Sequence, residues 1–149
     1  MQTQLELAKE GQITPQINAV AAQENWEPEI IRRRVAAGKI VIPAHPGRPD
    51  QMVVGIGKGL RTKVNASIGT SSDIVDVDLE IRKAQIAEVE GADTLMELST
   101  GGDLNRIRRQ ILDHCRLPVG NVPLYQAFCE AARRYRNPNR LDPEFLFDL

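Results

Sequence analysis

The sequence predicts an α/β fold in which a helical N-terminal region with short strands precedes three strand–loop–helix units. The first unit is indicated by Arg61 to Thr70, where apolar and polar residues alternate as in a strand before a loop of small polar residues. Two later stretches repeat this plan, at residues 93–102 and 117–125. Strands that alternate with helices are typical of a parallel sheet, so we expect one here.

The N-terminal region carries helix start and stop signals. Thr14 and Pro15 favour a helix start, because Thr caps the helix and Pro occupies a position where no N–H is needed. Gly38 favours the end of a later helix. The predicted helices cover residues 2–10, 15–24 and 29–37.

Short strands are predicted next, at residues 40–44 and 52–54. The turn-forming residues 45–50 between them suggest a division into a helical region, residues 1–50, and a β/α region, residues 51–149. The glycine-rich stretch 55–59 fits neither a dinucleotide-binding fingerprint nor a P-loop, and a strand follows it instead of a helix. We therefore predict a hairpin turn.

Each later strand is followed by an amphipathic helix. Val77, Ile81 and Ala84 form an apolar stripe at helical spacing, and Gly91 favours the end of that helix. Asp103 is the expected cap of the next helix, whose inner face would carry residues 104, 107 and 111.

The third strand is expected from Leu117 to Leu124, with irregular ends because it contains two prolines. A helix should follow from Tyr125 to about Tyr135, with Phe128 facing inward. One more helix is predicted to begin at Asp142 and Pro143.

The bulk composition narrows the functional classes. The chain has 149 residues, a net charge of −1, 42% hydrophobic residues and no apolar run of membrane-spanning length. This balance gives no electrostatic reason to expect nucleic acid or a membrane surface as a partner, and we expect a cytoplasmic chain. Cys115 and Cys129 lack metal-ligand spacing and are expected to be reduced thiols.

Polar residues gather where the predicted strands end. Asn65 and Ser67 belong to the first strand, Met96 and Glu97 to the second, and Tyr125 follows the third. Strand carboxyl ends and the loops after them carry the reactive groups of β/α barrels, so a polar pocket is expected there. Glu97 could brace a neighbouring loop or act in chemistry. No pair of nucleophile and base is present, and these residues alone do not name a ligand.

Three blocks of sequence are similar to the family of phosphomethylpyrimidine synthase, the thiamine-pyrimidine enzyme. The blocks read RTKVNASIGTSSD, GADTLMELSTGGDLNRIRRQIL and LPVGNVPLYQAF. The N-terminal GQITPQINAVAAQE, VAAGKIVIPA and GIGKGLRTKVN also match, so the resemblance covers nearly the whole chain.

The resemblance implies the first three β/α units of a (β/α)₈ barrel, truncated, in a homodimeric radical-SAM enzyme. A [4Fe–4S] cluster and S-adenosylmethionine would generate a radical that rearranges aminoimidazole ribotide. The family holds the cluster with a C-x2-C-x4-C motif and a divalent metal with late histidines, and this sequence contains neither. The 149-residue chain alone is therefore expected to be inactive, and we expect it to be part of a longer polypeptide or a shortened form of one.

The same resemblance assigns substrate-binding positions one at a time. Met96 and Tyr125 match the family's Met and Tyr. Ser67 stands where the family has its substrate-binding Asn, whereas Asn65 keeps the first Asn of that motif. A hydroxyl cannot make the same pair of hydrogen bonds as an amide, which suggests altered handling of the ribotide.

These residues leave two possible reaction products undecided. The substitution favours the paralogue 5-hydroxybenzimidazole synthase, which makes the lower-ligand base of anaerobic cobamides. A divergent thiamine-pyrimidine enzyme could carry the same change. A third interpretation, of another class, is a non-catalytic ligand-binding or oligomerisation module, because the cluster and metal ligands are absent from these residues.

Overall fold

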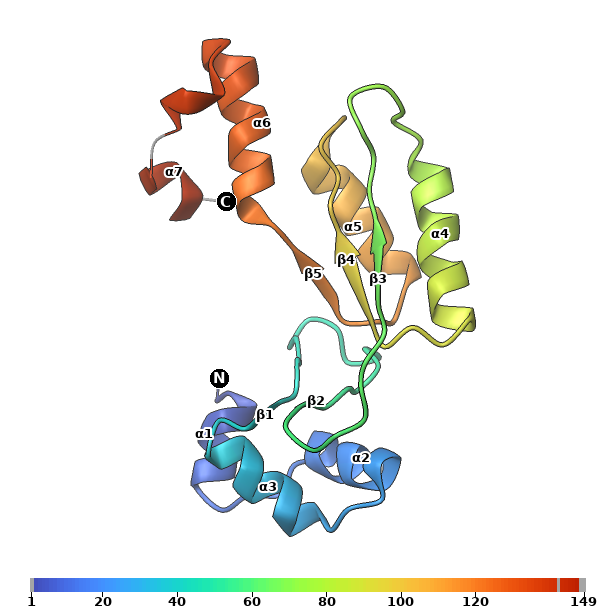
Figure 1. Ribbon diagram of the computed structural model, residues 1–149, viewed down its shortest axis with the longest axis vertical. Helices are drawn as coiled ribbons and strands as arrows, with labels where there is room; N and C mark the ends of the chain where they lie inside the picture. Colours follow the sequence, from blue (N-terminus) through green and yellow to red (C-terminus); the bar gives the residue numbers. More distant parts are fainter. Residues whose placement is uncertain (1, 142, 148–149) are drawn as a thin grey trace. The chain divides into compact units, whose positions relative to one another are not determined.

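The computed structural model describes residues 2–141 and 143–147. The chain forms two compact units, Met1–Val64 and Asn65–Leu149, called here the N-terminal unit and the C-terminal unit. Each is described by itself. Figure 1 gives the labels of the helices and strands.

The N-terminal unit contains three short helices and a small antiparallel pair of strands. Its elements are α1 (Gln4–Lys9), α2 (Pro15–Glu24), α3 (Pro28–Ala36), β1 (Ile40–Val41) and β2 (Ile56–Gly57). The predicted helix starts are confirmed, because the Thr14 side chain accepts a hydrogen bond from the Ile17 N–H and Pro15 begins α2. Gly38 follows α3 with a positive φ of 68°, a conformation that glycine adopts without strain.

A hydrophobic cluster holds this unit together. Ile17 of α2, Ile31 of α3 and Ile40 of β1 are fully buried in it, and Val53 and Leu60 pack against it. The segment 51–64, which the sequence assigned to the β/α region, therefore lies in the N-terminal unit. The strand predicted at residues 52–54 is wrong, because the ladder partner of β1 is β2, a few residues later.

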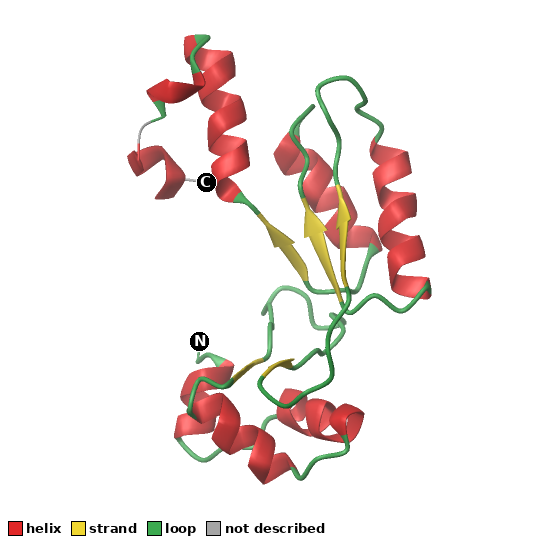
Figure 2. Ribbon diagram, viewed as in Figure 1, coloured by secondary structure: helices red, strands yellow, loops and turns green. Residues whose placement is uncertain are grey.

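The C-terminal unit contains a parallel sheet with the strand order β3-β4-β5 (Figure 2). Its strands are β3 (Asn65–Ile68), β4 (Thr94–Glu97) and β5 (Val119–Asn121). The helices are α4 (Val77–Val89), α5 (Leu104–His114), α6 (Pro123–Tyr135), the 3₁₀ helix η1 (Pro138–Arg140) and α7 (Pro143–Phe147). The three predicted strand–loop–helix units and their parallel arrangement are confirmed.

The core of this unit lies between the sheet and the helices α4 and α5. Leu95 of β4 and Ile111 of α5 are fully buried there, and Ala84 of α4 joins them. Because successive side chains of a strand point to opposite faces, Asn65, Ser67 and Met96 lie on the other face of the sheet. The alternation predicted from the sequence thus separates an apolar core face from a polar face.

Two predictions for the end of the chain need correction. The third strand is shorter than expected, since Val122 already precedes the first turn of α6 and Pro123 begins that helix. Phe128 does not face inward: it is 50% exposed, because α6 buries its other face, with Gln126 and Ala127. Asp142, the expected cap of the last helix, lies outside the described residues.

Candidate functional site

The predicted site residues of the sheet lie next to one another on its polar face. In the parallel register Ser67 of β3 is opposite Met96 of β4, and Asn65 is opposite Thr94. The Thr94 hydroxyl donates a hydrogen bond of 2.9 Å to Asn65 Oδ1. That bond occupies the amide oxygen and leaves Asn65 Nδ2 as the donor offered to a ligand.

Gly120 of β5 makes room for the Met96 side chain. The two residues are opposite each other in the register of β4 and β5. A Cβ atom at position 120 would lie 2.7 Å from Met96 Sδ, which is closer than real Cβ contacts. The glycine therefore permits the methionine to lie flat across the neighbouring strand.

Tyr125 is placed by a different element. It lies in the first turn of α6, where its N–H donates to the Val122 carbonyl at 3.0 Å, and its side chain is 45% exposed. The structure thus brings Asn65, Ser67 and Met96 together on one face. Within the described residues no hydrogen bond joins these three residues to Tyr125.

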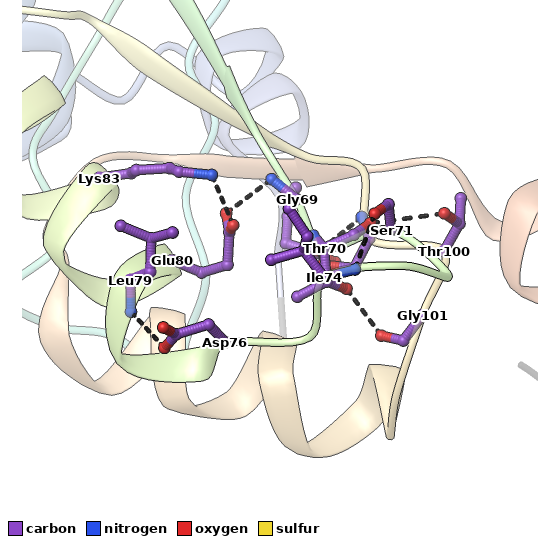
Figure 3. A network of polar contacts seen from close by, with 12 residues as sticks. Gly69, Thr70, Ser71, Ile74, Asp76, Leu79, Glu80, Lys83, Thr100 and Gly101 are labelled. Atoms are coloured by element: carbon purple, nitrogen blue, oxygen red, sulfur yellow. Dashed lines mark hydrogen bonds and ion pairs between the residues drawn. The ribbon is translucent and has the colours of Figure 1, made fainter.

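The loops after β3 and β4 are bonded to each other (Figure 3). The Thr70 hydroxyl donates to the Gly101 carbonyl at 2.7 Å, and the Thr70 N–H donates to Ser99 Oγ at 3.0 Å. The Thr100 N–H donates in return to the Thr70 carbonyl at 3.0 Å. These bonds join the carboxyl ends of the two strands into one rim.

The small polar side chains of this rim serve the protein itself. The Ser71 hydroxyl accepts from the N–H groups of Asp73 and Ile74, and Thr70 and Ser99 are used in the bonds between the loops. Thr70 and Ser99 lie at the strand ends, where the sequence predicts a polar pocket. In the structure they hold the rim together, so a ligand would meet a pre-formed surface.

Two buried carboxylates hold this rim from beneath. Glu80 of α4 accepts a hydrogen bond of 2.8 Å from the Gly69 N–H and pairs with Lys83 Nζ at 2.6 Å (Figure 3). Glu97 accepts from the Ser99 N–H at 2.8 Å and lies 3.5 Å from Arg108 Nε. Of the two roles left open for Glu97, the contacts favour bracing, since the carboxylate is buried on the helix side of the sheet.

Sequence reasoning did not single out Glu80 or Arg108. Both had a signal, because each occupies a position of the buried stripe of its helix. Glu80 falls between Val77 and Ala84 of α4, and Arg108 between Leu104 and Ile111 of α5. A charged residue at a helix position that faces the core needs a polar or oppositely charged partner inside the protein. Such a residue in the sequence therefore indicates a polar network at the rim.

The described residues do not fit an iron–sulfur cluster or a metal ion. A cluster needs several thiolates, but the Cys115 thiol is buried and directed at the Ala84 carbonyl, and the Cys129 thiol at the Thr100 carbonyl. Both are free cysteines, as expected. Residues 2–141 and 143–147 contain no group of three or more His, Cys, Asp or Glu that could hold a metal.

A cavity of about 640 Å³ lies in the N-terminal unit and contains none of the predicted site residues. Its lining is largely apolar and includes Val35, Ile42 and Met52. Gln51, one of its polar residues, already donates to the Pro43 carbonyl at 2.9 Å.

No helix within the described residues is long and apolar enough to cross a membrane.

Comparison with known proteins identifies the family of this chain. Residues 3–149 match the model of the radical SAM ThiC family. The chain is 67% identical over its whole length to the 5-hydroxybenzimidazole synthase of Geobacter sulfurreducens, and 64% identical over its whole length to that of Desulforapulum autotrophicum. It covers 34% of each of these two relatives.

A relative with another name is nearly as similar. Over 133 residues, or 89% of the chain, it is 61% identical to phosphomethylpyrimidine synthase 1 of Methanosarcina barkeri, of which it covers 31%. The chain thus spans about a third of the length of the curated relatives that it matches. The resemblance read from the three sequence blocks is confirmed.

Proposed function

Because the chain belongs to the radical SAM ThiC family, we propose that it is the N-terminal part of a synthase that rearranges aminoimidazole ribotide to 5-hydroxybenzimidazole. The observation that carries the choice of product is the order of similarity. The two relatives named 5-hydroxybenzimidazole synthase are 67% and 64% identical over the whole chain, and the pyrimidine synthase is 61% identical over a shorter part.

The alternative product is the pyrimidine phosphate of thiamine biosynthesis. One observation favours it: the difference in identity between the two groups of relatives is small. Asn65, which matches the first Asn of the pyrimidine-family motif, also lies on the polar face of the sheet. The substrate would be the same ribotide, so the two candidates differ in the product formed and not in the substrate bound.

The fold of the whole protein belongs to this proposal. The parallel sheet β3-β4-β5 with α4 and α5 on one face would be the start of a (β/α)₈ barrel, and the polar face would be the barrel interior. Residues 1–50 would be a helical N-terminal domain and residues 51–149 the first part of the barrel. Residues 51–64 would then connect the two while packing on the N-terminal unit.

The ribotide would bind on the polar face, to Asn65, Ser67, Met96 and Tyr125. The first three support this by their adjacency, since they combine an amide donor, a hydroxyl and a thioether on neighbouring strands. Met96 would pack against the imidazole ring, and Ser67 and Asn65 would hydrogen-bond polar groups of the ligand. Tyr125, exposed at the start of α6, would contact the ligand from the next strand–helix unit.

The cofactors would be held by residues other than those described. Radical-SAM enzymes use S-adenosylmethionine and a [4Fe–4S] cluster, and we also propose a divalent metal. Neither the cluster nor the metal has a ligand set in the described residues, so the 149-residue chain alone should be inactive. The role left to this chain is to bind and orient the ribotide. A homodimeric, cytoplasmic enzyme without nucleic acid or membrane partners completes the proposal.

The identity of the base formed from the ribotide distinguishes the two candidate functions. The protein that carries this chain would be purified with its cofactors under anaerobic conditions and given aminoimidazole ribotide and S-adenosylmethionine. Mass spectrometry would then identify the base formed. We expect 5-hydroxybenzimidazole. A pyrimidine phosphate would establish the alternative, and unchanged ribotide would contradict both.

A module without catalysis, for ligand binding or oligomerisation, is the candidate of another class. It draws support from the absence of a metal-binding group among the described residues. It predicts that the protein leaves the ribotide unconverted, which the same assay measures.

A further inference from the structure

We infer that Arg108 is a positioning residue for the proposed ribotide site, one that fixes the ends of β4 and β5 and the first turn of α6 relative to one another. The inference rests on the proposed function, because it concerns the same polar face. Arg108 lies on α5, on the opposite side of the sheet from Ser67 and Met96, so it would act without touching the ligand.

The guanidinium of Arg108 contacts three separate segments. Its Nε lies 3.5 Å from Oε2 of Glu97, at the end of β4. Its Nη2 donates a hydrogen bond of 3.0 Å to Oε1 of Gln126, in the first turns of α6. With the Asn121 amide oriented so that its oxygen faces the guanidinium, that oxygen accepts from Nη2 at 3.2 Å and from Nε at 3.1 Å, at the end of β5.

Each of these partners is the chain neighbour of a residue on or beside the polar face. Glu97 follows Met96. Asn121 follows Gly120, the residue that makes room for Met96. Gln126 follows Tyr125. Because neighbouring residues share a peptide bond, fixing each partner of Arg108 also limits where its neighbour can lie.

These contacts are buried enough to be rigid. The Glu97 side chain is 1% exposed and the Arg108 side chain 21%. Gln126 is also buried, and its amide nitrogen donates to Asn105 Oδ1 and to Glu130 Oε1, both at 3.1 Å. The amide is therefore bonded at both ends, which fixes the direction from which it meets Arg108.

The geometry requires an arginine and not only a positive charge. A guanidinium is a planar fork whose donors can reach several acceptors at once, whereas a lysine ammonium is a compact point charge on a flexible stem. Lysine at position 108 would still neutralise the buried Glu97 carboxylate. It would not bond Glu97, Asn121 and Gln126 through one rigid set of donors, so the strand ends and the first turn of α6 would lose their common anchor.

The test compares Arg108→Lys with a matched control, Arg109→Gln, which changes an exposed arginine of the same helix. Steady-state kinetics would be measured on the cofactor-loaded protein that carries this chain. We expect Arg108→Lys to raise the KM for ribotide on the order of tenfold, with a smaller change in kcat, because displaced Met96 and Tyr125 side chains would bind the ribotide less well. Arg109→Gln should keep both values. An unchanged KM in Arg108→Lys would overturn the inference, because charge alone would then suffice.

A second readout separates this inference from the proposed function. If the wild-type protein leaves ribotide unchanged, the proposed function fails and NMR spectra of the protein that carries this chain decide on Arg108. Arg108→Lys should then shift the Tyr125 amide and the Met96 methyl signals, and Arg109→Gln should not. Wild-type signals in Arg108→Lys would overturn the positioning role.

Discussion

Ser67 and Met96 are register partners on the parallel strands β3 and β4, on the sheet face opposite the buried core. Their side chains therefore lie side by side where α4 and α5 do not reach. A hydroxyl next to a thioether can meet the polar edge and the flat face of one small heterocycle at the same time. This pairing is the basis of the proposed ribotide site.

Removal of the Ser67 hydroxyl should weaken ribotide binding. In the protein that carries this chain, Ser67→Ala should raise the KM for ribotide about fivefold, as for the loss of one neutral hydrogen bond. Thermal stability should hardly change, because Ser67 lies on the polar face of the sheet and not in the hydrophobic core. Ser72→Ala, in the loop after β3, is the matched control. Equal KM values for the two variants would remove Ser67 from the site.

Substitution of Gly101 should separate the two loops of the rim. A Cβ atom at this position would overlap the Ser71 carbonyl oxygen, a backbone atom that cannot rotate away. Gly101→Ala should lower the free energy of unfolding by about 2 kcal/mol, in the range of overpacked sites. Denaturant unfolding measures this.

Gly47→Ala is the control, because a Cβ atom there meets only the His45 side chain. If Gly101→Ala were as stable as Gly47→Ala, the contact between the loops would not be tight.

Loss of the Glu80 charge should loosen the loop after β3. Glu80 is 3% exposed and receives the Gly69 N–H, so Glu80→Gln should lower the free energy of unfolding by about 1–2 kcal/mol. Lys83→Met should cost much less, since the lysine side chain is 43% exposed and water screens its pairing with Glu80. Chemical denaturation measures the free energy of unfolding of both variants. Equal losses of this free energy would mean that Glu80 stabilises the fold through its ion pair with Lys83 and not through the Gly69 N–H.

Acid should destabilise the N-terminal unit through Glu24. Its carboxylate pairs with Lys63 Nζ at 2.7 Å and accepts from the Arg61 N–H at 2.9 Å, and both side chains of the pair are nearly buried. Burial raises the pKa of Glu24. The hydrogen bonds and positive charges of Lys63 and Arg61 together lower it by a larger amount, so the pKa lies below its ordinary value.

A carboxylate whose pKa is lower in the folded state stabilises the fold above its unfolded pKa, about 4.3 for glutamate. That contribution is lost as the pH falls through the folded pKa. The melting temperature of wild type should therefore fall more steeply below about pH 4.3 than that of Glu24→Gln. Parallel curves would show that Glu24 titrates normally.

The sequence predicted the features that depend on residues close to one another in the chain. Thr14 and Asp103 were identifiable as caps because a side-chain oxygen satisfies free N–H groups of the first helical turn. The inner stripe of α5 followed from helical spacing. The positions of Asn65 and Ser67 on the polar face followed from the alternation of a strand, whereas that of Met96 was seen only in the structure.

The predictions that were wrong concern features that depend on contacts between residues distant in sequence. Phe128 looked like a core residue by type, yet the side of α6 that packs is the one with Gln126 and Ala127. The pairing of β1 with β2, and not with residues 52–54, depends on a register that local propensity does not encode. The Arg108 contacts join three segments that meet only after the sheet has formed.

The most direct measurement locates the ribotide on the chain. The methyl groups of Met52 and Met96 would be labelled with carbon-13 and followed by NMR as aminoimidazole ribotide is added. Met52 lines the cavity of the N-terminal unit, and Met96 lies on the polar face of the sheet. We predict that the Met96 signal shifts with ribotide concentration and that the Met52 signal stays in place. A Met96 signal that does not move, with or without a shift of Met52, would contradict a ribotide site on this face.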